Sequence, residues 1–312
     1  MRYFVTGCAG FVGSTFADRL LGAGHSVVGF DNFSTGREAF IAAALRHPNF
    51  MLHRGDLLDA AAVRAAAAGC DTIVHLAANA DVRFGADHPL RDFEQNVGAT
   101  MNVLEAARLN GIATIAFSST GSIYGEATIV PTPEDAPIPI QTSLYGASKI
   151  AAEGFIEAYA EAFDLRAFIF RFVSLLGERY THGHVLDFCR QLREHPRELH
   201  VLGDGTQRKS YLYVGDCIDA MLLALDRPAG RVNVYNLGSD GYCQIHDSVA
   251  WISERLGVQP RITYGGGDRG WIGDNPFIFL DTARIRELGW NPTLSIRAAV
   301  ERTVDFIVKE QL

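Results

Sequence analysis

The sequence predicts an α/β protein with a doubly wound parallel sheet and a smaller C-terminal α/β lobe. Short apolar runs suited to buried parallel strands alternate with helically spaced segments through the first half of the chain. A glycine-rich turn joins the first of these strands to a helix. The chain of 312 residues is long enough for a large domain and an appended lobe. We therefore place the main domain at residues 1–172 and the lobe at residues 173–312.

The first strand and helix lie almost at the start of the chain. An apolar run follows Arg2 and breaks at Gly7, and helical spacing then begins at Phe11. Three glycines in this turn have separate tasks: Gly7 makes the turn, Gly10 lets the backbone approach a pyrophosphate, and Gly13 lets the helix lie close to the sheet.

The start of this helix is suited to binding phosphate. Its first residues, Phe11 and Val12, present free backbone N–H groups and the partial positive charge of the helix N-terminus. Because strand, turn, helix and chain position agree, we expect a Rossmann-type dinucleotide site here and not a purely structural turn.

The second strand, residues 26–30, ends on Asp31. An acid at this position accepts hydrogen bonds from the adenosine ribose hydroxyls and repels a 2′-phosphate, which favours NAD over NADP. A loop cap is the alternative role for Asp31. Small polar residues follow and are expected beside the ribose, namely Asn32, Ser34, Thr35 and Gly36.

Two further strands follow. Residues 50–54 form the third, after which Asp59 is expected to cap an alanine-rich helix. Residues 71–78 form the fourth, which runs into small residues where a cofactor can cross the sheet. These last residues are Leu76, Ala77 and Ala78.

The fifth strand, residues 112–117, leads into Ser118, Ser119 and Thr120, and a proline-rich loop follows. The next helix carries Tyr145 and Lys149, which share one face because they are four residues apart. The ammonium group, together with a positively charged nicotinamide ring, is expected to favour the phenolate and bring the tyrosine towards a working pKa for a base. An ordinary surface tyrosine is the alternative.

The rest of the chain has another strand at residues 166–171, followed by Phe172, and then turn-rich segments typical of an appended lobe. Residues 294–307 have helical apolar spacing and are expected to close it.

Composition narrows the class of protein. The net charge is −8 and the basic residues are scattered, which argues against nucleic acid or a membrane surface as partner and favours a small molecule. The five cysteines are isolated, so we expect reduced core thiols and neither a disulfide framework nor a metal site. The first strand begins at residue 2 and no apolar run reaches membrane-spanning length, which predicts a cytoplasmic protein.

Three motifs together carry a family resemblance. The Gly-x-x-Gly-x-x-Gly turn, the Ser-Ser-Thr strand end and Tyr-x-x-x-Lys resemble the extended short-chain dehydrogenase/reductases of the nucleotide-sugar epimerase/dehydratase group, over nearly the whole chain. The resemblance implies NAD as cofactor and a triad of Thr120, Tyr145 and Lys149. In that chemistry the tyrosine takes a proton from a sugar hydroxyl while hydride passes to the nicotinamide, the threonine bonds the same oxygen and the lysine holds the ribose.

The resemblance also implies further cofactor contacts. Asp56 and Leu57 match the adenine-binding pair of the family, and Asn96 matches an asparagine near the nicotinamide ribose. Ser118 and Phe172, at two strand ends, complete the expected cofactor set. His75 is tempting as a base, but the family usually carries a structural histidine there. Family folds also return later segments, about residues 210–240, to the main sheet.

For the substrate, the resemblance points to basic residues around a diphosphate. In the segment 203–214, Lys209 stands where the family has arginine and Arg208 precedes it, so either could reach phosphate. Arg269 is a second candidate, with a solvated turn as the alternative. Arg83 lies where the family often has a substrate-facing basic residue, although it could equally be a solvated loop arginine.

The fate of the ketosugar depends on the neighbours of Thr120. Family 4,6-dehydratases carry an Asp-Glu pair there, decarboxylases a glutamate and 3,5-epimerases a cysteine at the second position, whereas this chain has Gly121 and Ser122. With no extra acid or thiol, returning the hydride to the opposite face is the simplest outcome. We therefore predict a UDP-hexose 4-epimerase, with UDP-glucose and UDP-galactose as the first pair.

Alternatives remain open. Ser174 replaces the asparagine of most relatives, and hydroxyl residues occur there in UDP-glucuronate 4-epimerases, whose carboxylate Arg83 could face. A nucleotide-sugar dehydratase is a further alternative. A non-catalytic NAD(H) sensor is disfavoured because such proteins usually lose the tyrosine or lysine of the triad. The family commonly forms homodimers through a four-helix bundle, here built from residues 87–110 and 142–163.

Overall fold

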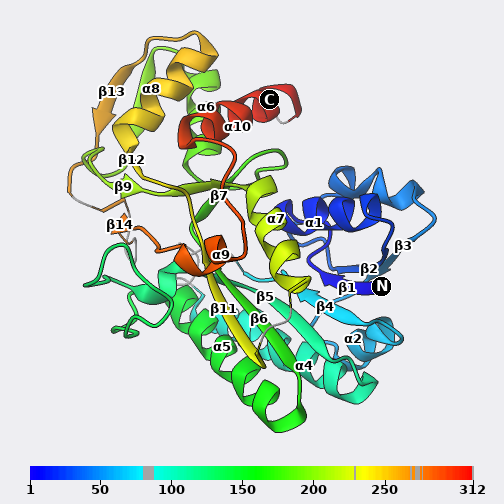
Figure 1. The fold of residues 1–312 in the computed structure, drawn as a ribbon. Helices are drawn as coiled ribbons and strands as arrows, with labels where there is room; N and C mark the ends of the chain where they lie inside the picture. The colour runs from blue at the N-terminus through cyan, green and yellow to red at the C-terminus, as the bar shows by residue number, and fades with distance from the viewer. Residues whose placement is uncertain (80–87, 228–229, 268, 271–274, 276, 311–312) are drawn as a thin grey trace.

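A parallel sheet forms the centre of the molecule (Figure 1). The computed structural model describes residues 1–312 except 80–87, 228–229, 268, 271–274, 276 and 311–312. Seven strands pair in the order β11-β6-β5-β4-β1-β2-β3, all parallel. They are β1 (Arg2–Thr6), β2 (Ser26–Asp31), β3 (Phe50–Arg54), β4 (Thr72–His75), β5 (Thr114–Thr120), β6 (Arg166–Phe172) and β11 (Val232–Leu237). This arrangement confirms the predicted doubly wound sheet.

Both faces of the sheet are buried. Along β6, Phe168 and Phe170 pack into one hydrophobic core, while Ala167 and Ile169 pack into a second core on the other face. Successive side chains of a strand point to opposite faces, so a strand covered on both sides must be apolar throughout. This explains the continuous apolar runs of the sequence.

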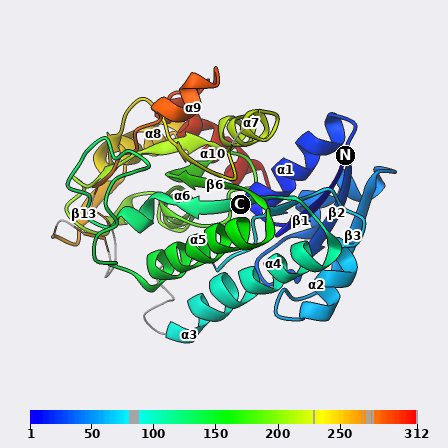
Figure 2. The same ribbon diagram turned by 60° about the horizontal axis from the view of Figure 1, so that its bottom comes forward.

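Helices cover both faces. On one side lie α2 (Ala60–Ala67), α4 (Ala99–Asn110) and α5 (Leu144–Phe163), whose buried residues belong to one core. On the other side lie α1 (Phe11–Gly22) and α7 (Val214–Leu225). Figure 2 shows α4 and α5 side by side on the face that carries no lobe.

Two strand ends differ from the expected limits. Strand β4 ends at His75 and not at residue 78, because the next two backbone N–H groups turn to Thr6 Oγ1, at 3.1 and 3.2 Å. Strand β5 continues to Thr120 and not to residue 117, because its pairing with β6 extends to Phe172.

The long helix expected at residues 87–110 contains a wider turn. Its described part begins with α3 (Pro89–Asp92), continues through the π-helical turn η4 (Phe93–Gly98) and runs into α4. The π turn carries the buried Asn96. Such single π turns occur often at functional sites.

The C-terminal lobe consists of short strands and helices at one end of the sheet (Figure 1). Its helices are α6 (His184–Glu194), α8 (Ile245–Leu256), α9 (Ala283–Glu287) and α10 (Ile296–Glu310). Its strands are β7 (Ser174–Leu176), β8 (Glu198–Val201), β9 (Arg208–Lys209), β10 (Tyr211–Tyr213), β12 (Cys243–Gln244), β13 (Arg261–Tyr264) and β14 (Phe277–Ile278). The main domain also contains three short 3₁₀ turns, η1 (Glu38–Ile41), η2 (Ala44–Arg46) and η5 (Gly121–Tyr124). Strand β11 then returns to the main sheet beside β6.

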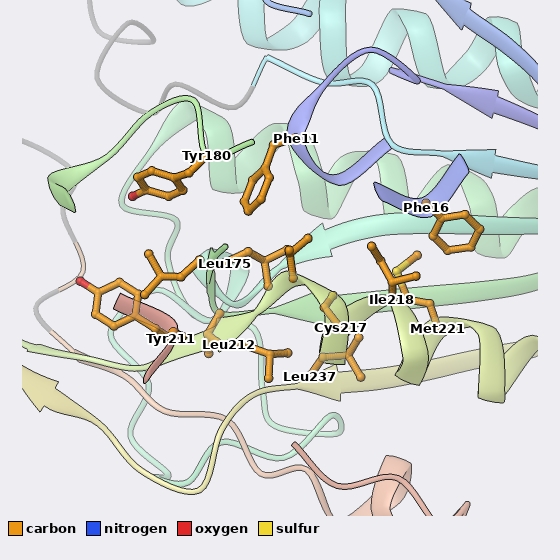
Figure 3. Close-up of a cluster of buried hydrophobic side chains, with 14 of the residues drawn as sticks. Phe11, Phe16, Leu175, Tyr180, Tyr211, Leu212, Cys217, Ile218, Met221 and Leu237 are labelled. Carbon is orange, nitrogen blue, oxygen red and sulfur yellow. The ribbon is translucent and has the colours of Figure 1, made fainter. Parts of the chain in front are cut away.

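One hydrophobic core joins the lobe to the sheet (Figure 3). The ring of Phe11, at the start of α1, meets the ring of Tyr180 edge-on at 5.8 Å between centroids. Leu175, Leu212 and Ile218 continue the same cluster from β7, β10 and α7. The first turn of α1 is therefore packed against residues that follow the sixth strand.

The cysteines are core residues. All five are unpaired and buried, as expected from their isolated positions: Cys8, Cys70, Cys189, Cys217 and Cys243. Burial raises the pKa of the Cys189 and Cys243 thiols to about 12. Along the described part of the chain, no helix combines the length and apolarity needed to cross a membrane.

Candidate active site

The turn after β1 depends on its glycines. Gly7 has a φ of +68°, and a Cβ there would lie 2.9 Å from the backbone of Ala77. A Cβ on Gly13 would lie 2.0 Å from the Gly7 carbonyl oxygen, so only glycine lets α1 start this close to the strand. The Gly10 N–H donates to the same oxygen at 3.0 Å and closes the turn.

No side chain caps the N-terminus of α1. Its N-cap residue, Gly10, has no side chain that could accept a hydrogen bond from the first helical N–H groups. Phe11 and Val12 begin the helix directly after it. The local geometry therefore fits the diphosphate of a dinucleotide.

Asp31 connects the glycine turn to the loop that follows β2. The buried carboxylate accepts from the backbone N–H of Ala9 and of Phe33, both at 2.8 Å. Gly36 lies against it, since a Cβ there would be 2.9 Å from Asp31 Oδ1. The loop-cap role is thus present, and each carboxylate oxygen keeps acceptor capacity for a ribose hydroxyl.

The residues expected to bind the adenine end of NAD lie next to this loop. Asn32 Nδ2 donates to Asp56 Oδ2 at 3.1 Å, and Asn32 Oδ1 accepts from the Ser34 N–H at 2.9 Å. Leu57 is buried beside them, and Thr35 follows Ser34 in the same loop. The residues assigned to adenine and ribose from sequence are therefore neighbours in space.

His75 is held as a structural residue. Its Nδ1 lies 2.7 Å from Thr6 Oγ1 and its Nε2 lies 3.0 Å from Thr100 Oγ1. Complete burial lowers the pKa of His75 to about 3, and the charge of Lys149 adds to the effect. The ring is neutral and fully engaged, which agrees with the structural role that the sequence predicts.

Thr120 and Tyr145 meet at the carboxyl end of β5. Ser143 caps α5 by accepting from the Gly146 N–H at 3.0 Å, which fixes the first turn that carries Tyr145. The Tyr145 hydroxyl and Thr120 share a hydrogen bond. Thr120 Oγ1 also accepts from the Ser122 N–H at 3.1 Å and donates to Ser122 Oγ at 3.2 Å. Three hydroxyl groups therefore converge at this strand end.

Lys149 lies one helical turn further along α5 and is buried. Its Nζ donates to the Ser118 carbonyl at 2.9 Å and lies 4.6 Å from the centre of the Phe117 ring. Burial lowers the pKa of Lys149 to about 7, while the charges of Glu153 and Asp92 oppose this change.

The protein groups alone keep the phenol of Tyr145 neutral, and the expectation that Lys149 and a bound nicotinamide together favour the phenolate stays a prediction. Burial raises the pKa of Tyr145 to about 12, the hydrogen bond with Thr120 opposes this rise, and Asp92 adds to it. The reason is that loss of water disfavours the phenolate and the ammonium alike.

Asn96 ties the helix of Tyr145 to the segment after β4. Its Nδ2 donates to Ser148 Oγ at 2.9 Å and to the Asn79 carbonyl at 3.2 Å, and its Oδ1 accepts from the Asn79 N–H at 2.8 Å. Both amide hydrogens are used, so only Oδ1 has capacity left for a ribose hydroxyl.

The two basic residues of β9 have different surroundings. The Arg208 guanidinium lies over the Phe277 ring at 3.9 Å and near the Tyr242 ring at 5.6 Å. Lys209 Nζ donates to the Asn275 carbonyl at 2.7 Å. Successive residues of a strand face opposite sides, so only one of the pair can turn towards the site.

Asn275 links this strand to the segment just before α5. Its Oδ1 accepts from Thr142 Oγ1 at 3.0 Å, two residues before α5 begins. Lys209 is therefore the residue of the pair on the side of Tyr145.

The other expected substrate residues are spread along the edge of the lobe. Arg269 pairs with Glu126, which lies in the loop before α5, and both side chains are exposed. Ser174 is exposed at the start of β7, next to Phe172 at the end of β6. Arg83 lies outside the described residues.

Comparison with known proteins decides the family. A model described as the NAD dependent epimerase/dehydratase family matches residues 3–238, which is most of the chain. The chain belongs to this family. A UDP-glucose 4-epimerase from Mycolicibacterium smegmatis is 33% identical to this epimerase over 312 residues, covering 98% of each chain.

Solved structures agree with this assignment. A crystal structure of UDP-galactose 4-epimerase superposes with a TM-score of 0.89 at 36% identity, covering 100% of both chains. The UDP-glucuronic acid 4-epimerase of Bacillus cereus, in complex with UDP-glucuronic acid and NAD, superposes with a TM-score of 0.90 at 26% identity over 99% of both chains. The predicted membership of the extended short-chain dehydrogenase/reductases and the NAD cofactor are confirmed.

Sequence reasoning missed a buried ion pair beneath the epimerase site. Glu153, on α5, pairs with Arg171, on β6, through Nη2–Oε2 and Nε–Oε1 distances of 2.7 and 3.1 Å. Ser119 Oγ also donates to Glu153 Oε1, and Arg171 Nη1 donates to the hydroxyl of Tyr124 at 2.7 Å. The signal was available, because Glu153 follows Lys149 by four residues and therefore shares its helix face.

Proposed function

We propose that this epimerase interconverts UDP-hexoses at C4, with UDP-glucose and UDP-galactose as the first pair. The observation that carries the proposal is the space beside Thr120. A Cβ on Gly121 would lie 2.8 Å from Ile278 Cγ2 and 3.4 Å from both δ-carbons of Leu280, so the acid of a dehydratase at this position would have to displace these side chains. The named activity of the Mycolicibacterium smegmatis relative supports the same choice.

The proposed roles follow from the three converging hydroxyls and the lysine. NAD, when bound, accepts a hydride from the sugar and returns it. Tyr145 exchanges a proton with the C4 hydroxyl of the sugar. Thr120 forms a hydrogen bond with the same oxygen and orients it towards the Tyr145 hydroxyl. Lys149 contacts the cofactor ribose and contributes a positive charge near the phenol. Ser122, bonded to Thr120, borders the sugar.

For the diphosphate, we favour Lys209 over Arg208. Lys209 lies on the side of the catalytic helix, whereas the Arg208 guanidinium is stacked on aromatic rings. Arg269 is paired with Glu126 through Nη2, and its other N–H groups keep donor capacity for a phosphate.

UDP-glucuronate 4-epimerisation is the second candidate. The exposed hydroxyl residue Ser174 favours it, and so does the likeness to the Bacillus cereus enzyme. The assignment of Arg83 to a substrate carboxylate stays a prediction, as does the cytoplasmic location.

A substrate panel tests the proposal. Purified protein is incubated with UDP-glucose, UDP-galactose, UDP-glucuronate, dTDP-glucose and GDP-mannose without added cofactor, and products are separated by chromatography. We expect C4 epimers from the UDP-hexoses. Tyr145→Phe should lower turnover by about 10²-fold or more, while NAD stays bound. A 4-keto-6-deoxy product would establish a dehydratase, and conversion of UDP-glucuronate alone would establish the second candidate.

We infer that the enzyme is a homodimer that pairs through α4 and α5. These helices lie side by side on one face, and large apolar side chains are exposed on them, namely Leu109, Leu144, Phe155 and Phe163. Exposed apolar residues gathered on one helical face are typical of a subunit interface.

A further inference from the structure

Three functional side chains share one face of α5. Tyr145, Lys149 and Glu153 follow one another at intervals of four residues. The two charged residues are almost completely buried, with 2% and 1% of their surfaces exposed. Charged groups in such positions need partners, because removal of water destabilises an isolated ion by several kcal/mol.

The ammonium and the carboxylate are fixed to consecutive residues of β5. Lys149 Nζ donates to the Ser118 carbonyl at 2.9 Å, and Glu153 accepts from Ser119 Oγ. Arg171 then holds both carboxylate oxygens from the neighbouring strand, with Nη2–Oε2 at 2.7 Å and Nε–Oε1 at 3.1 Å. Glu153 therefore has one defined position one helical turn from Lys149.

The charge of Lys149 depends on its anionic neighbours. Burial lowers the pKa of Lys149 to about 7. The negative charge of Glu153 opposes this change most strongly, and the charge of Asp92 in α3 opposes it less. Among the other groups near Lys149, His75 is neutral at working pH because its own pKa is lowered to about 3. Tyr145 is neutral as well, because burial raises its pKa to about 12.

We propose that Glu153 is a positioning residue that favours the cationic form of Lys149 inside the dry interior, and that Arg171 and Ser119 hold Glu153 in place for this task. The proposal rests on the proposed catalytic role of Lys149 but not on which sugar the enzyme binds. The competing explanation is that the Glu153–Arg171 pair only clamps α5 to the sheet.

The scarcity of lysine makes a direct test practical. The chain has three lysines, Lys149, Lys209 and Lys309, so the ε-carbon signals of ¹³C-lysine-labelled protein can be assigned with Lys209→Arg and Lys309→Arg. We expect the NMR titration of Lys149 to move to lower pH by about one unit or more in Glu153→Gln. Glu157→Gln is the matched control, because it makes the same change one turn further along α5 at an exposed position. It should leave Lys149 unchanged.

A double variant separates the effect of the Glu153 charge on Lys149 from its effect on the stability of the fold. Glu153→Gln leaves Arg171 buried without its carboxylate, whereas Glu153→Gln/Arg171→Met removes both charges. We expect the double variant to fold more stably than the single one and to keep the lowered titration of Lys149. Glu153→Asp, which retains the charge, should shift the titration back towards that of the unmodified protein.

Enzyme kinetics give an independent readout. Lys149 loses its proton at lower pH when its pKa falls, so the alkaline limb of the kcat profile should move to lower pH in the double variant. A purely structural clamp would reduce stability without moving this limb. If Lys149 titrates in the folded double variant at the same pH as in the unmodified protein, the proposal is overturned, whatever substrate the enzyme proves to use.

Discussion

At the scale of single residues, the stability of the fold depends on pH through two histidines, His75, which is buried, and His184, which is partly buried. His75 lies between Thr6 and Thr100, and the His184 ring nitrogens lie 2.7 Å from Ser248 Oγ and 3.2 Å from the Tyr211 hydroxyl. Burial lowers the pKa of both histidines to about 3. Each is therefore neutral in the folded protein at any pH at which the enzyme could work.

These histidines predict a loss of stability in mild acid. Below about pH 6.5 both histidines are protonated in the unfolded chain but stay neutral in the folded chain. The free energy of unfolding therefore falls by about 1.4 kcal/mol per pH unit for each histidine. Between pH 7 and pH 5 the two together should remove about 4 kcal/mol. Urea unfolding at both pH values measures this loss.

A variant separates the contribution of His75 from that of the other titrating groups. His75→Gln should show a smaller difference between the two pH values, although its stability at pH 7 will also fall because the bonds to Thr6 and Thr100 change. His195→Gln is the control, because His195 is exposed. An equal pH difference in all three proteins would contradict the prediction.

The sequence predicts that Thr120, Tyr145 and Lys149 lie together, but it does not predict their ionisation. Spacing alone places Tyr145 and Lys149 on one helix face, and a strand end following an apolar run brings Thr120 to the same edge of the sheet. The pKa values depend on how much water the folded chain removes, and this is a tertiary property. For the same reason Glu153 resembled an ordinary helix acid until its burial and its ion pair with Arg171 were visible.

At the scale of elements, the contact between β1 and α1 is the tightest part of the cofactor site. A Cβ on Gly13 would lie 2.0 Å from the Gly7 carbonyl oxygen, and a backbone atom cannot yield as a flexible side chain can. The helix would have to move away from the turn that is to bind the diphosphate.

We therefore expect Gly13→Ala to destabilise the protein by about 1–3 kcal/mol and to weaken NAD binding. Urea unfolding and calorimetric titration with NAD measure the two effects. Gly22→Ala is the matched control, since it lies in the same helix and an added Cβ there meets no atom within 4 Å. Unchanged NAD affinity in Gly13→Ala would show that the helix does not need this close approach.

The type and order of elements in the main domain followed from periodicity, whereas local detail did not. The early end of β4 arises from a side-chain acceptor, Thr6 Oγ1, that lies 70 residues away in sequence from the first N–H it binds. Asn96, in the π turn, bonds to Asn79 and Ser148, which lie 17 and 52 residues away in sequence. The spacing of hydrophobic residues in the sequence predicts none of these hydrogen bonds.

At the scale of the whole molecule, the exposed face of α4 and α5 predicts how copies associate. Sedimentation velocity at micromolar concentration should show a dimer. Phe155→Glu should shift the protein to monomers, because it places a charge within the apolar contact. Ile262→Glu, on the exposed strand β13 of the lobe, should leave the dimer intact. A monomer for the unmodified chain would rule out this mode of assembly.

The placing of all five cysteines in the core has a practical consequence. Because these thiols are shielded from reagents, a cysteine introduced on the surface would be modified far faster than any native one. Cysteines could be introduced at Leu45, in the sheet domain, and at Ile262, in the lobe, because both residues are exposed. Fluorescence energy transfer between dyes attached to them would report the distance between the two parts. The distance between the two parts could then be compared with and without a nucleotide sugar, and none of the native cysteines would first have to be replaced.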